Sequence, residues 1–223
     1  MDWPVLASVP AADRRRLVGQ MRRRAYRRDE VIFHQGDPAD TLHLIAEGHV
    51  SVRVTLAGGE FVIVDVLGPG DAFGERALIG SPRSRTATVT ALERCETLSL
   101  GRDQFESLRT SYPGIDRFLV ELLSARVDRL NRYLLEALYV PAERRVLGRL
   151  LELCQLYADD DEQGIVIPVT QDMLASLAGT TRPTANQVLG RLAASQVVEV
   201  SRGQIVVANR GELRRRADPS GRS

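Results

Sequence analysis

The sequence of 223 residues contains no lysine, so all 30 of its basic residues are arginine. We attribute this absence to the codon usage of a GC-rich genome rather than to function. No run approaches the roughly 20 apolar residues that a membrane-spanning helix needs. The N-terminus has no basic segment followed by an apolar one, the pattern of a secretory signal. These absences predict a cytoplasmic protein that has no membrane partner.

Cysteine and histidine are also scarce. Cys95 and Cys154 are too few for a four-cysteine iron–sulfur site, and we interpret them as reduced thiols. His34, His43 and His49 have no His-x-His spacing and no nearby pair of carboxylates, so we interpret them as ordinary surface or capping residues rather than ligands of a metal or haem. No Ser–His–Asp or paired-carboxylate constellation is suggested either. The sequence therefore predicts neither a metal site nor an enzyme.

Short β-strand patterns fill the chain from Asp29 to about Leu100. Glycine-rich turns separate them, which is typical of a barrel or roll, and Gly58-Gly59 predicts a hairpin. The residues before Asp29 carry eight arginines and predict a short helix with a solvated basic face. The strands are expected at Val31–Phe33, Leu42–Ile45, Val50–Leu56, Phe61–Leu67 and Thr86–Ala91.

The hydrophobic period becomes helical after Arg102. Apolar residues recur at steps of three and four, and they predict a helix from about Pro113 to Tyr139 that is roughly 40 Å long. Such a long apolar stripe needs a partner. Part of it can pack on the roll, and the rest is expected to pack on the same helix of a second subunit. Pro141 interrupts the pattern and marks a hinge to a second domain.

The second domain carries the pattern of helix, short turn and helix. Thr170 fits the N-cap of the first helix, Gly179 fits its end, and Thr180 or Thr181 fits the N-cap of a second helix. A β-hairpin is expected from Val197–Val200 and Gln204–Val207. Small polar residues at the start of the second helix suit the reading of base edges in a DNA major groove, namely Thr181, Arg182, Thr184, Asn186 and Gln187. A purely structural pair of helices stays an alternative at this point.

The segment Gly70–Val89 predicts a cradle for a ligand that carries a sugar and a phosphate. Gly74 lets backbone amides approach an anion, and a short helix starting there directs its free amides the same way. Arg85 can hold two phosphate oxygens, and Thr86 adds a hydroxyl donor. Phosphate would repel Glu75, so we expect this carboxylate to accept from a sugar hydroxyl.

Taken together, these motifs resemble the cyclic-AMP receptor protein (Crp–Fnr) family of bacterial transcription regulators over roughly residues 15–210. The resemblance rests on the FGERAL…RTATV segment, the long helix, the TTRPT helix-turn-helix and the roll glycines Gly36, Gly48, Gly68 and Gly70. It implies an α+β fold with an N-terminal cyclic-nucleotide-binding β-roll (1–113), a long dimerisation helix (114–140), a C-terminal winged helix-turn-helix (141–215) and a disordered tail (216–223).

The same resemblance implies partners and an effector. The partners would be a second copy of the chain, double-stranded DNA with a palindromic operator, and RNA polymerase. The effector would be cyclic AMP or another cyclic nucleotide, and no cofactor is implied. The alternative is the same DNA-binding regulator without a ligand, or with an effector that is not a nucleotide.

The resemblance also assigns roles in the cradle. Glu75 would bind the ribose 2′-hydroxyl. The cyclic phosphate would meet Arg85, Thr86 and the backbone near Gly74 and Ala77. Three apolar residues would line the base: Val52, Val64 and Leu67.

Three positions depart from the family's pattern. Cyclic-AMP responders place two adjacent polar residues of the long helix against adenine, where this chain has Leu130 and Asn131. Asn131 can still hydrogen-bond the base, whereas Leu130 cannot and falls on the apolar stripe. Arg76 replaces a common apolar residue, and it would bridge to Glu75 or to an acid across the dimer, such as Asp65, or stay exposed at the rim. Which nucleotide fills the cradle therefore stays open.

In the second helix of the helix-turn-helix, Arg182 aligns with the family's guanine-reading arginine. Its bidentate contact would be worth about 1–3 kcal/mol of discrimination. Pro183 stands where the family often has glutamate and cannot accept from a cytosine amine, so the half-site should differ from the usual one. Asn186 and Gln187 could read adenine or touch phosphate. Two threonines are expected to touch phosphate, Thr170 and Thr181.

Overall fold

The computed structural model describes residues 6–7, 9–79, 83–111, 115–158 and 164–217. Their contacts divide the chain into two units, one of Met1–Phe61 with Asp65–Asn131 and the other of Val62–Val64 with Arg132–Ser223. Among the described residues, no helix is long and apolar enough to cross a bilayer.

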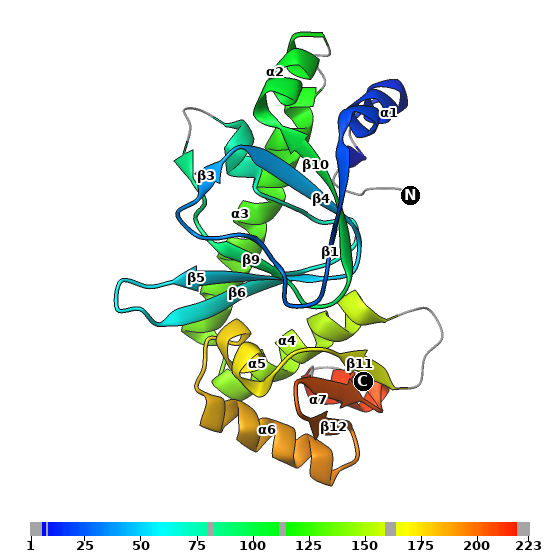
Figure 1. The fold of residues 1–223 in the computed structure, drawn as a ribbon. Helices are drawn as coiled ribbons and strands as arrows, with labels where there is room; N and C mark the ends of the chain where they lie inside the picture. The colour runs from blue at the N-terminus through cyan, green and yellow to red at the C-terminus, as the bar shows by residue number, and fades with distance from the viewer. Residues whose placement is uncertain (1–5, 8, 80–82, 112–114, 159–163, 218–223) are drawn as a thin grey trace. The chain divides into compact units, whose positions relative to one another are not determined.

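Antiparallel strands form the roll of the first unit (Figure 1). One sheet has the order β1-β10-β4-β7, and a second has the order β2-β9-β5-β6. The first comprises β1 (Arg22–Tyr26), β10 (Cys95–Gly101), β4 (Thr41–Glu47) and β7 (Ala72–Phe73). The second comprises β2 (Val31–Phe33), β9 (Thr88–Ala91), β5 (Val50–Thr55) and β6 (Phe61–Leu67). The two-residue strands β3 (Pro38–Ala39) and β8 (Arg83–Ser84) pair with each other.

Two apolar clusters hold this unit together. One lies inside the roll and includes Ile45, Leu67 and Phe73. The other includes Phe105 and Phe118, and it joins the first sheet to α1 (Ala11–Gln20), α2 (Arg102–Ser111) and α3 (Ile115–Tyr139). Both phenylalanines are fully buried, and each such side chain stabilises the fold by roughly 1.5–3 kcal/mol.

Most of the predicted elements are present in this unit. The Gly58-Gly59 hairpin is confirmed, because Gly59 has a φ of +85° and the Leu56 amide donates to the Glu60 carbonyl at 2.7 Å. The long helix is also confirmed as α3, whose predicted start at Pro113 lies outside the described residues. Both cysteines are free and buried. Strand β10 was not among the predicted strands.

The prediction of one helix before residue 29 is right for α1, which ends at Gln20, and wrong for the residues that follow it. Residues Arg22–Tyr26 form the edge strand β1, which pairs with β10 from Arg22 opposite Ser99 to Tyr26 opposite Cys95. The ladder of hydrogen bonds to β10 outweighs the helical preference of this arginine run. Charged side chains on an edge strand also discourage pairing with other sheets.

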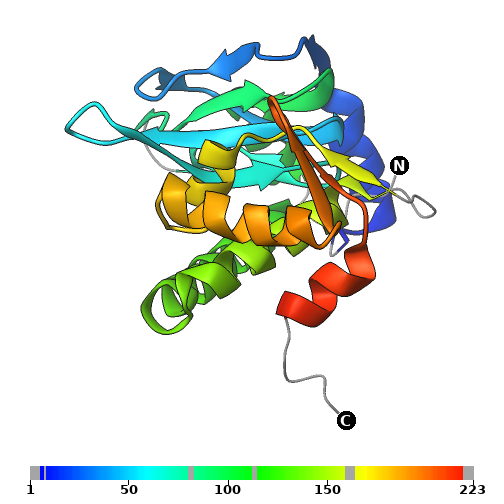
Figure 2. The ribbon, with the colours of Figure 1, turned by 90° about the horizontal axis from the view of Figure 1, so that it is seen from below.

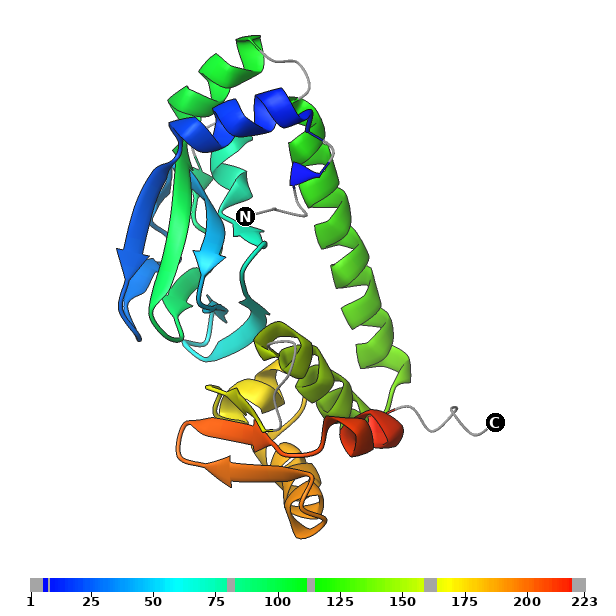
Figure 3. The same cartoon turned by 90° about the vertical axis from the view of Figure 1, so that its right-hand side faces the viewer.

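The second unit packs helices against a small sheet (Figures 2 and 3). Its helices are α4 (Ala142–Tyr157), α5 (Gln171–Leu177), α6 (Arg182–Ala194) and α7 (Arg210–Ala217). The sheet has the order β11-β13-β12, formed by Ile165–Ile167, Gln204–Val207 and Val198–Ser201. The hairpin of β12 and β13 matches the prediction, whereas β11 was not predicted.

Capping of the two central helices follows the prediction. The Thr170 hydroxyl accepts from the Met173 amide at 3.1 Å, and the Thr181 hydroxyl accepts from the Thr184 amide at 3.5 Å. Gly179 takes the left-handed conformation with a φ of +57°. The predicted tail from residue 216 was wrong at its start, because residues 216 and 217 belong to α7, and residues 218–223 lie outside the described residues.

Candidate ligand pocket and DNA-reading surface

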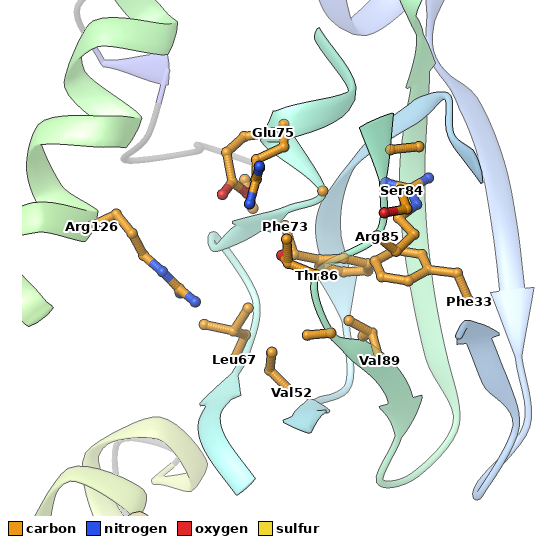
Figure 4. A pocket seen from close by; sticks show the side chains of 15 residues that line it. Phe33, Val52, Leu67, Phe73, Glu75, Ser84, Arg85, Thr86, Val89 and Arg126 are labelled. Atoms are coloured by element: carbon orange, nitrogen blue, oxygen red, sulfur yellow. The ribbon is translucent and has the colours of Figure 1, made fainter. Parts of the chain in front are cut away.

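A pocket opens in the roll beside Gly74 (Figure 4). It holds about 510 Å³ of space, part of which is open to solvent. In Figure 4, Glu75 lies at one end, and the apolar residues Val52, Leu67 and Val89 gather at the other. Of the predicted ligand residues, the pocket brings together Val52, Leu67, Gly74, Glu75, Arg76, Arg85 and Thr86.

Position 74 requires glycine because of its backbone conformation and because of the atoms that lie close to it. It has a φ of +80° and precedes the short 3-10 helix η2 (Glu75–Leu78). A Cβ atom at this position would lie 2.7 Å from the Thr41 carbonyl oxygen and 2.8 Å from Nη1 of Arg85. Only glycine therefore lets the Arg85 guanidinium pack against the backbone here.

Arg85 is a buried cation with one unsatisfied donor. Its Nη1 donates to the Thr41 carbonyl at 2.7 Å, and its Nη2 donates to the Thr41 hydroxyl at 2.8 Å and to Asp40 Oδ1 at 3.1 Å. The guanidinium also lies 4.0 Å from the centre of the Phe33 ring. Its Nε is buried and has no hydrogen-bond acceptor among the described residues. Burial lowers the pKa of Arg85, and the Asp40 carboxylate opposes that shift. An anion that reached the guanidinium would both satisfy a donor and neutralise a desolvated charge.

His43 contacts Thr41, the residue whose carbonyl and hydroxyl accept from Arg85. Its Nε2 lies 3.2 Å from the Thr41 hydroxyl, its Nδ1 lies 3.1 Å from the Thr97 hydroxyl, and its ring stacks on Phe73 at 5.0 Å. Burial, assisted by the positive charge of Arg85, lowers the pKa of His43 to about 4. The imidazole is therefore neutral at pH 7.

The prediction of surface histidines was wrong for two of the three. His43 and His49 are both buried, and each has polar partners: Thr41 and Thr97 for His43, and Glu93, in the turn between β9 and β10, for His49. Within the described residues, no group of three or more histidine, cysteine, aspartate or glutamate residues could hold a metal ion.

Asp65 binds two arginines of α3. Its Oδ2 accepts from Nη1 of Arg126 and from Nη1 of Arg129, both at 3.0 Å. Burial raises the pKa of this carboxyl, and the two arginines oppose the shift. These two arginines bind Asp65 within the single chain, and a bridge from Arg76 to an acid across the dimer stays a prediction. Arg126 also extends from α3 toward the pocket and lines it (Figure 4).

Sequence reasoning did not name eight of the residues that line the pocket, and it named four residues that do not line it. Phe33, Phe73 and Arg126 line the pocket but were not predicted, because their positions depend on pairing between distant strands and on α3. Four predicted ligand residues do not line it in the single chain, namely Val64, Ala77, Leu130 and Asn131.

The middle and end of α3 present a row of large apolar side chains to solvent. Leu130, Leu134 and Leu138 are 55%, 58% and 64% exposed in the single chain, and Val120 and Val127 are exposed in the same way. These positions recur at steps of three, four and seven along one helix. A contiguous apolar patch of this kind marks a surface that binds another protein.

The second helix of the helix-turn-helix exposes its predicted polar face. Arg182, Asn186 and Gln187 are exposed, and Nε of Arg182 lies 3.4 Å from Oδ1 of Asp172 on α5. The hydroxyls of Thr181 and Thr184 lie 3.0 Å apart and can hydrogen-bond each other. The DNA roles of these residues and of Thr170 stay predictions.

Known protein families match both units. Residues 23–112 match the cyclic nucleotide-binding domain family, and residues 144–216 match the Crp-like helix-turn-helix domain family. The Cyclic AMP receptor protein of Thermus thermophilus is 34% identical over 185 residues, which is 83% of each chain. This chain belongs to the Crp–Fnr family. As a member of that family, it is a transcription regulator with a cyclic nucleotide-binding domain and a DNA-binding helix-turn-helix.

Other relatives agree with this assignment. The CRP-like cAMP-activated global transcriptional regulator of Mycobacterium tuberculosis is 27% identical over 192 residues, 85% of each chain. The crystal structure of the catabolite activator protein of Thermus thermophilus is 30% identical, covers 96% of this chain and 98% of that one, and has a TM-score of 0.55. FixK2 of Bradyrhizobium japonicum, 23% identical with a TM-score of 0.73 over 87% of this chain and 96% of that one, shares the fold.

Proposed function

We propose that a cyclic nucleotide binds in the pocket at Arg85 and gates the binding of this Crp–Fnr regulator to DNA. The observation that carries the proposal is the buried guanidinium of Arg85, which lines the pocket and whose Nε lacks an acceptor in the described chain. In this proposal residues 1–113 bind the nucleotide, 114–140 pair two subunits and 141–215 bind DNA in the cytoplasm. We propose no enzymatic activity, since the matched families are regulators.

The lining of the pocket fits a sugar phosphate. Three arginines and one carboxylate line it, so an anion is favoured. The cyclic phosphate would accept from Arg85 and from Thr86 and the amides near Gly74 and Ala77. Asp40, the acidic partner of Arg85, has a side chain that is 78% exposed. Water can therefore solvate this carboxylate when phosphate takes its place beside Arg85.

The other end of the ligand has its own partners. The Glu75 carboxylate would accept from the ribose 2′-hydroxyl, and Arg76 would stay at the rim. The base would lie against three apolar residues of the roll: Val52, Val64 and Leu67. Leu130 and Asn131 are exposed on α3 and would approach the base when the dimer forms, with Asn131 as the hydrogen-bonding partner. We propose cyclic AMP as the effector, and cyclic GMP is the nucleotide to compare with it.

Pairing of two subunits would cover the apolar row on α3. Two copies of α3 packed side by side would remove Leu130, Leu134 and Leu138 from water. A homodimer places its two recognition helices α6 in successive major grooves about 34 Å apart, so the operator would be palindromic. Arg182 would read guanine, with Thr184, Asn186 and Gln187 beside it, and Thr170 and Thr181 would touch phosphate. RNA polymerase is the further partner that a transcription regulator of this kind would contact.

Calorimetric titration of the chain with cyclic AMP and with cyclic GMP tests the proposal. We expect binding that Arg85→Ala abolishes, because the phosphate would lose its buried cation. Arg53→Ala is the matched control: its guanidinium also lies over a phenylalanine ring, at 5.0 Å from Phe61, and its Nε is also buried without an acceptor among the described residues, but Arg53 does not line the pocket. Absence of heat with both nucleotides would contradict the proposal.

A ligand-independent regulator, or one with a non-nucleotide effector, is the second candidate, and Leu130 favours it. An apolar side chain at an adenine-reading position cannot hydrogen-bond the base. Selection of DNA sites from a random pool, with and without cyclic nucleotide, separates the two functions. Equal affinity for the selected site in both conditions would support the second candidate.

A further inference from the structure

The first helix of the helix-turn-helix ends in carbonyl groups that accept from another helix. A helix leaves its last four carbonyls without amide partners of its own. At the end of α5, the carbonyls of Ala178 and Gly179 accept from Nε and Nη2 of Arg145, at 2.8 and 2.9 Å. The carbonyl of Leu177 accepts from Nε of Arg149 at 3.2 Å. Two arginines of α4 therefore cap α5, and a cation at a helix C-terminus also favours the helix dipole.

The same two arginines bind the end of α3. Nη1 of Arg145 donates to the Val140 carbonyl at 2.7 Å, directly before the Pro141 hinge. Nη2 of Arg149 donates to the Glu136 carboxylate on α3, and its guanidinium lies 3.7 Å from the centre of the Tyr133 ring. Nη1 of Arg149 also donates to Glu152 within α4 at 2.6 Å. Each guanidinium thus joins the last turns of α3 to the last turn of α5.

The planar guanidinium groups of Arg145 and Arg149 make the connection between α3 and α5 rigid. A guanidinium is rigid, always charged and donates in fixed directions. The Arg149 side chain is only 6% exposed, so a lost partner could not be replaced freely by water. The last turns of α3 cannot move away from α4 without breaking these bonds or moving the end of α5. Four residues after the end of α5, Thr181 caps the start of α6.

We propose that Arg145 and Arg149 are positioning residues that couple the last turns of α3 to the recognition helix α6. Together they form an arginine clamp between the end of α3 and the α5–α6 turn. The inference rests on the proposed function only in taking α3 as the element that carries the nucleotide signal. The coupling itself lies within residues 132–217.

Hydrogen exchange of the full chain, followed by mass spectrometry without nucleotide, tests the clamp. Glu136→Ala removes the carboxylate of α3 that binds Arg149, and it leaves the bond between Arg149 and Glu152 in place. Because a hydrogen bond to a charged group is lost, exchange in the α5–α6 turn, about 40 residues away in sequence, should speed up roughly tenfold to a hundredfold. Arg145→Lys keeps the charge but cannot bind three carbonyls in a planar fork, and it should speed exchange in the same turn.

Glu212→Ala is the matched control. The Glu212 side chain is 26% exposed against 28% for Glu136, and it also binds arginines, but only within α7. Removal of the Glu212 carboxylate should leave hydrogen exchange in the α5–α6 turn unchanged. Unchanged exchange in that turn for both Glu136→Ala and Arg145→Lys, or an equal rise in Glu212→Ala, would overturn the clamp.

Nucleotide titration of the unaltered chain keeps the two proposals apart. If no nucleotide binds but Glu136→Ala still loosens the α5–α6 turn, the clamp stands and nucleotide gating fails. If nucleotide binds and the turn does not respond to Glu136→Ala or Arg145→Lys, the clamp fails alone.

Discussion

Substitution of Gly74 by alanine tests the geometry at the phosphate end of the pocket. The left-handed conformation costs an alanine about 1–2 kcal/mol. Its Cβ would also lie 2.7 Å from the Thr41 carbonyl oxygen and 2.8 Å from Nη1 of Arg85. The carbonyl belongs to strand β4 and cannot yield freely, so overpacking adds about 1–3 kcal/mol. We expect Gly74→Ala to lower the free energy of unfolding by about 2–5 kcal/mol.

The chain offers a matched control in the Gly58-Gly59 hairpin. Gly59 has a φ of +85°, and a Cβ there would meet nothing within 4 Å. Gly59→Ala should therefore lose only the conformational part, about 1–2 kcal/mol. Denaturant unfolding measures both losses, and calorimetry with cyclic AMP and cyclic GMP measures ligand affinity. We expect Gly74→Ala to weaken nucleotide binding strongly, because Arg85 must move, and Gly59→Ala to leave it unchanged.

Two results would contradict the role given to Gly74. Equal losses of stability in the two alanine variants would mean that the close contacts of Gly74 cost nothing. Wild-type nucleotide affinity in Gly74→Ala would mean that the position of Arg85 beside this glycine does not matter for binding.

Three further predictions concern His43, the DNA-reading helix and α3. As the pH falls from about 6.5 to about 4, unfolded chains protonate His43 while the buried ring with a pKa of about 4 does not, so stability falls. The wild type should lose up to about 3 kcal/mol more than His43→Gln over this range, measured by denaturant unfolding at each pH. Arg182→Ala should lose about 1–3 kcal/mol of preference for its selected site but retain salt-sensitive binding to other DNA, measured by competitive gel shift. Leu134→Glu should shift the chain toward monomers in sedimentation, because it places a charge in the proposed interface, whereas Val166→Glu, at a residue 49% exposed on β11, should not.

A different result would contradict each of these three predictions. Parallel pH curves for the wild type and His43→Gln would show that the buried imidazole titrates normally. An unchanged site preference in Arg182→Ala would remove that arginine from base reading. A dimer that survives Leu134→Glu would place the interface away from the apolar row.

Local patterns predicted the parts of the fold that depend on near neighbours. Thr170 and Thr181 cap their helices as expected, since a cap needs only the next three residues. The glycine hairpin and the period of α3 are local in the same sense. Gly74, Glu75, Arg85 and Thr86 meet in one pocket because the segment between Gly70 and Val89 brings them together within a few strands.

The features that the sequence could not predict depend on contacts between residues that lie far apart in the chain. The arginine run of β1 has no strand alternation, and its conformation depends on β10, with Arg23 bound to Glu96 across 73 positions. Asp65 meets Arg126 and Arg129 across more than 60 positions. Arg145 binds backbone carbonyls, which exist at every residue and therefore leave no trace in the sequence. Burial of His43 likewise depends on Thr97 from another strand.

The unsatisfied Nε of Arg85 links the stability of the free protein to its affinity for ligand. A buried donor without an acceptor costs about 1–3 kcal/mol, and the free chain carries that cost before any ligand arrives. A ligand oxygen that reaches Nε removes the cost, so part of the affinity is relief of a pre-existing penalty rather than a new attraction. A substitution that supplied an internal acceptor to Nε would make the protein more stable and a weaker receptor at the same time.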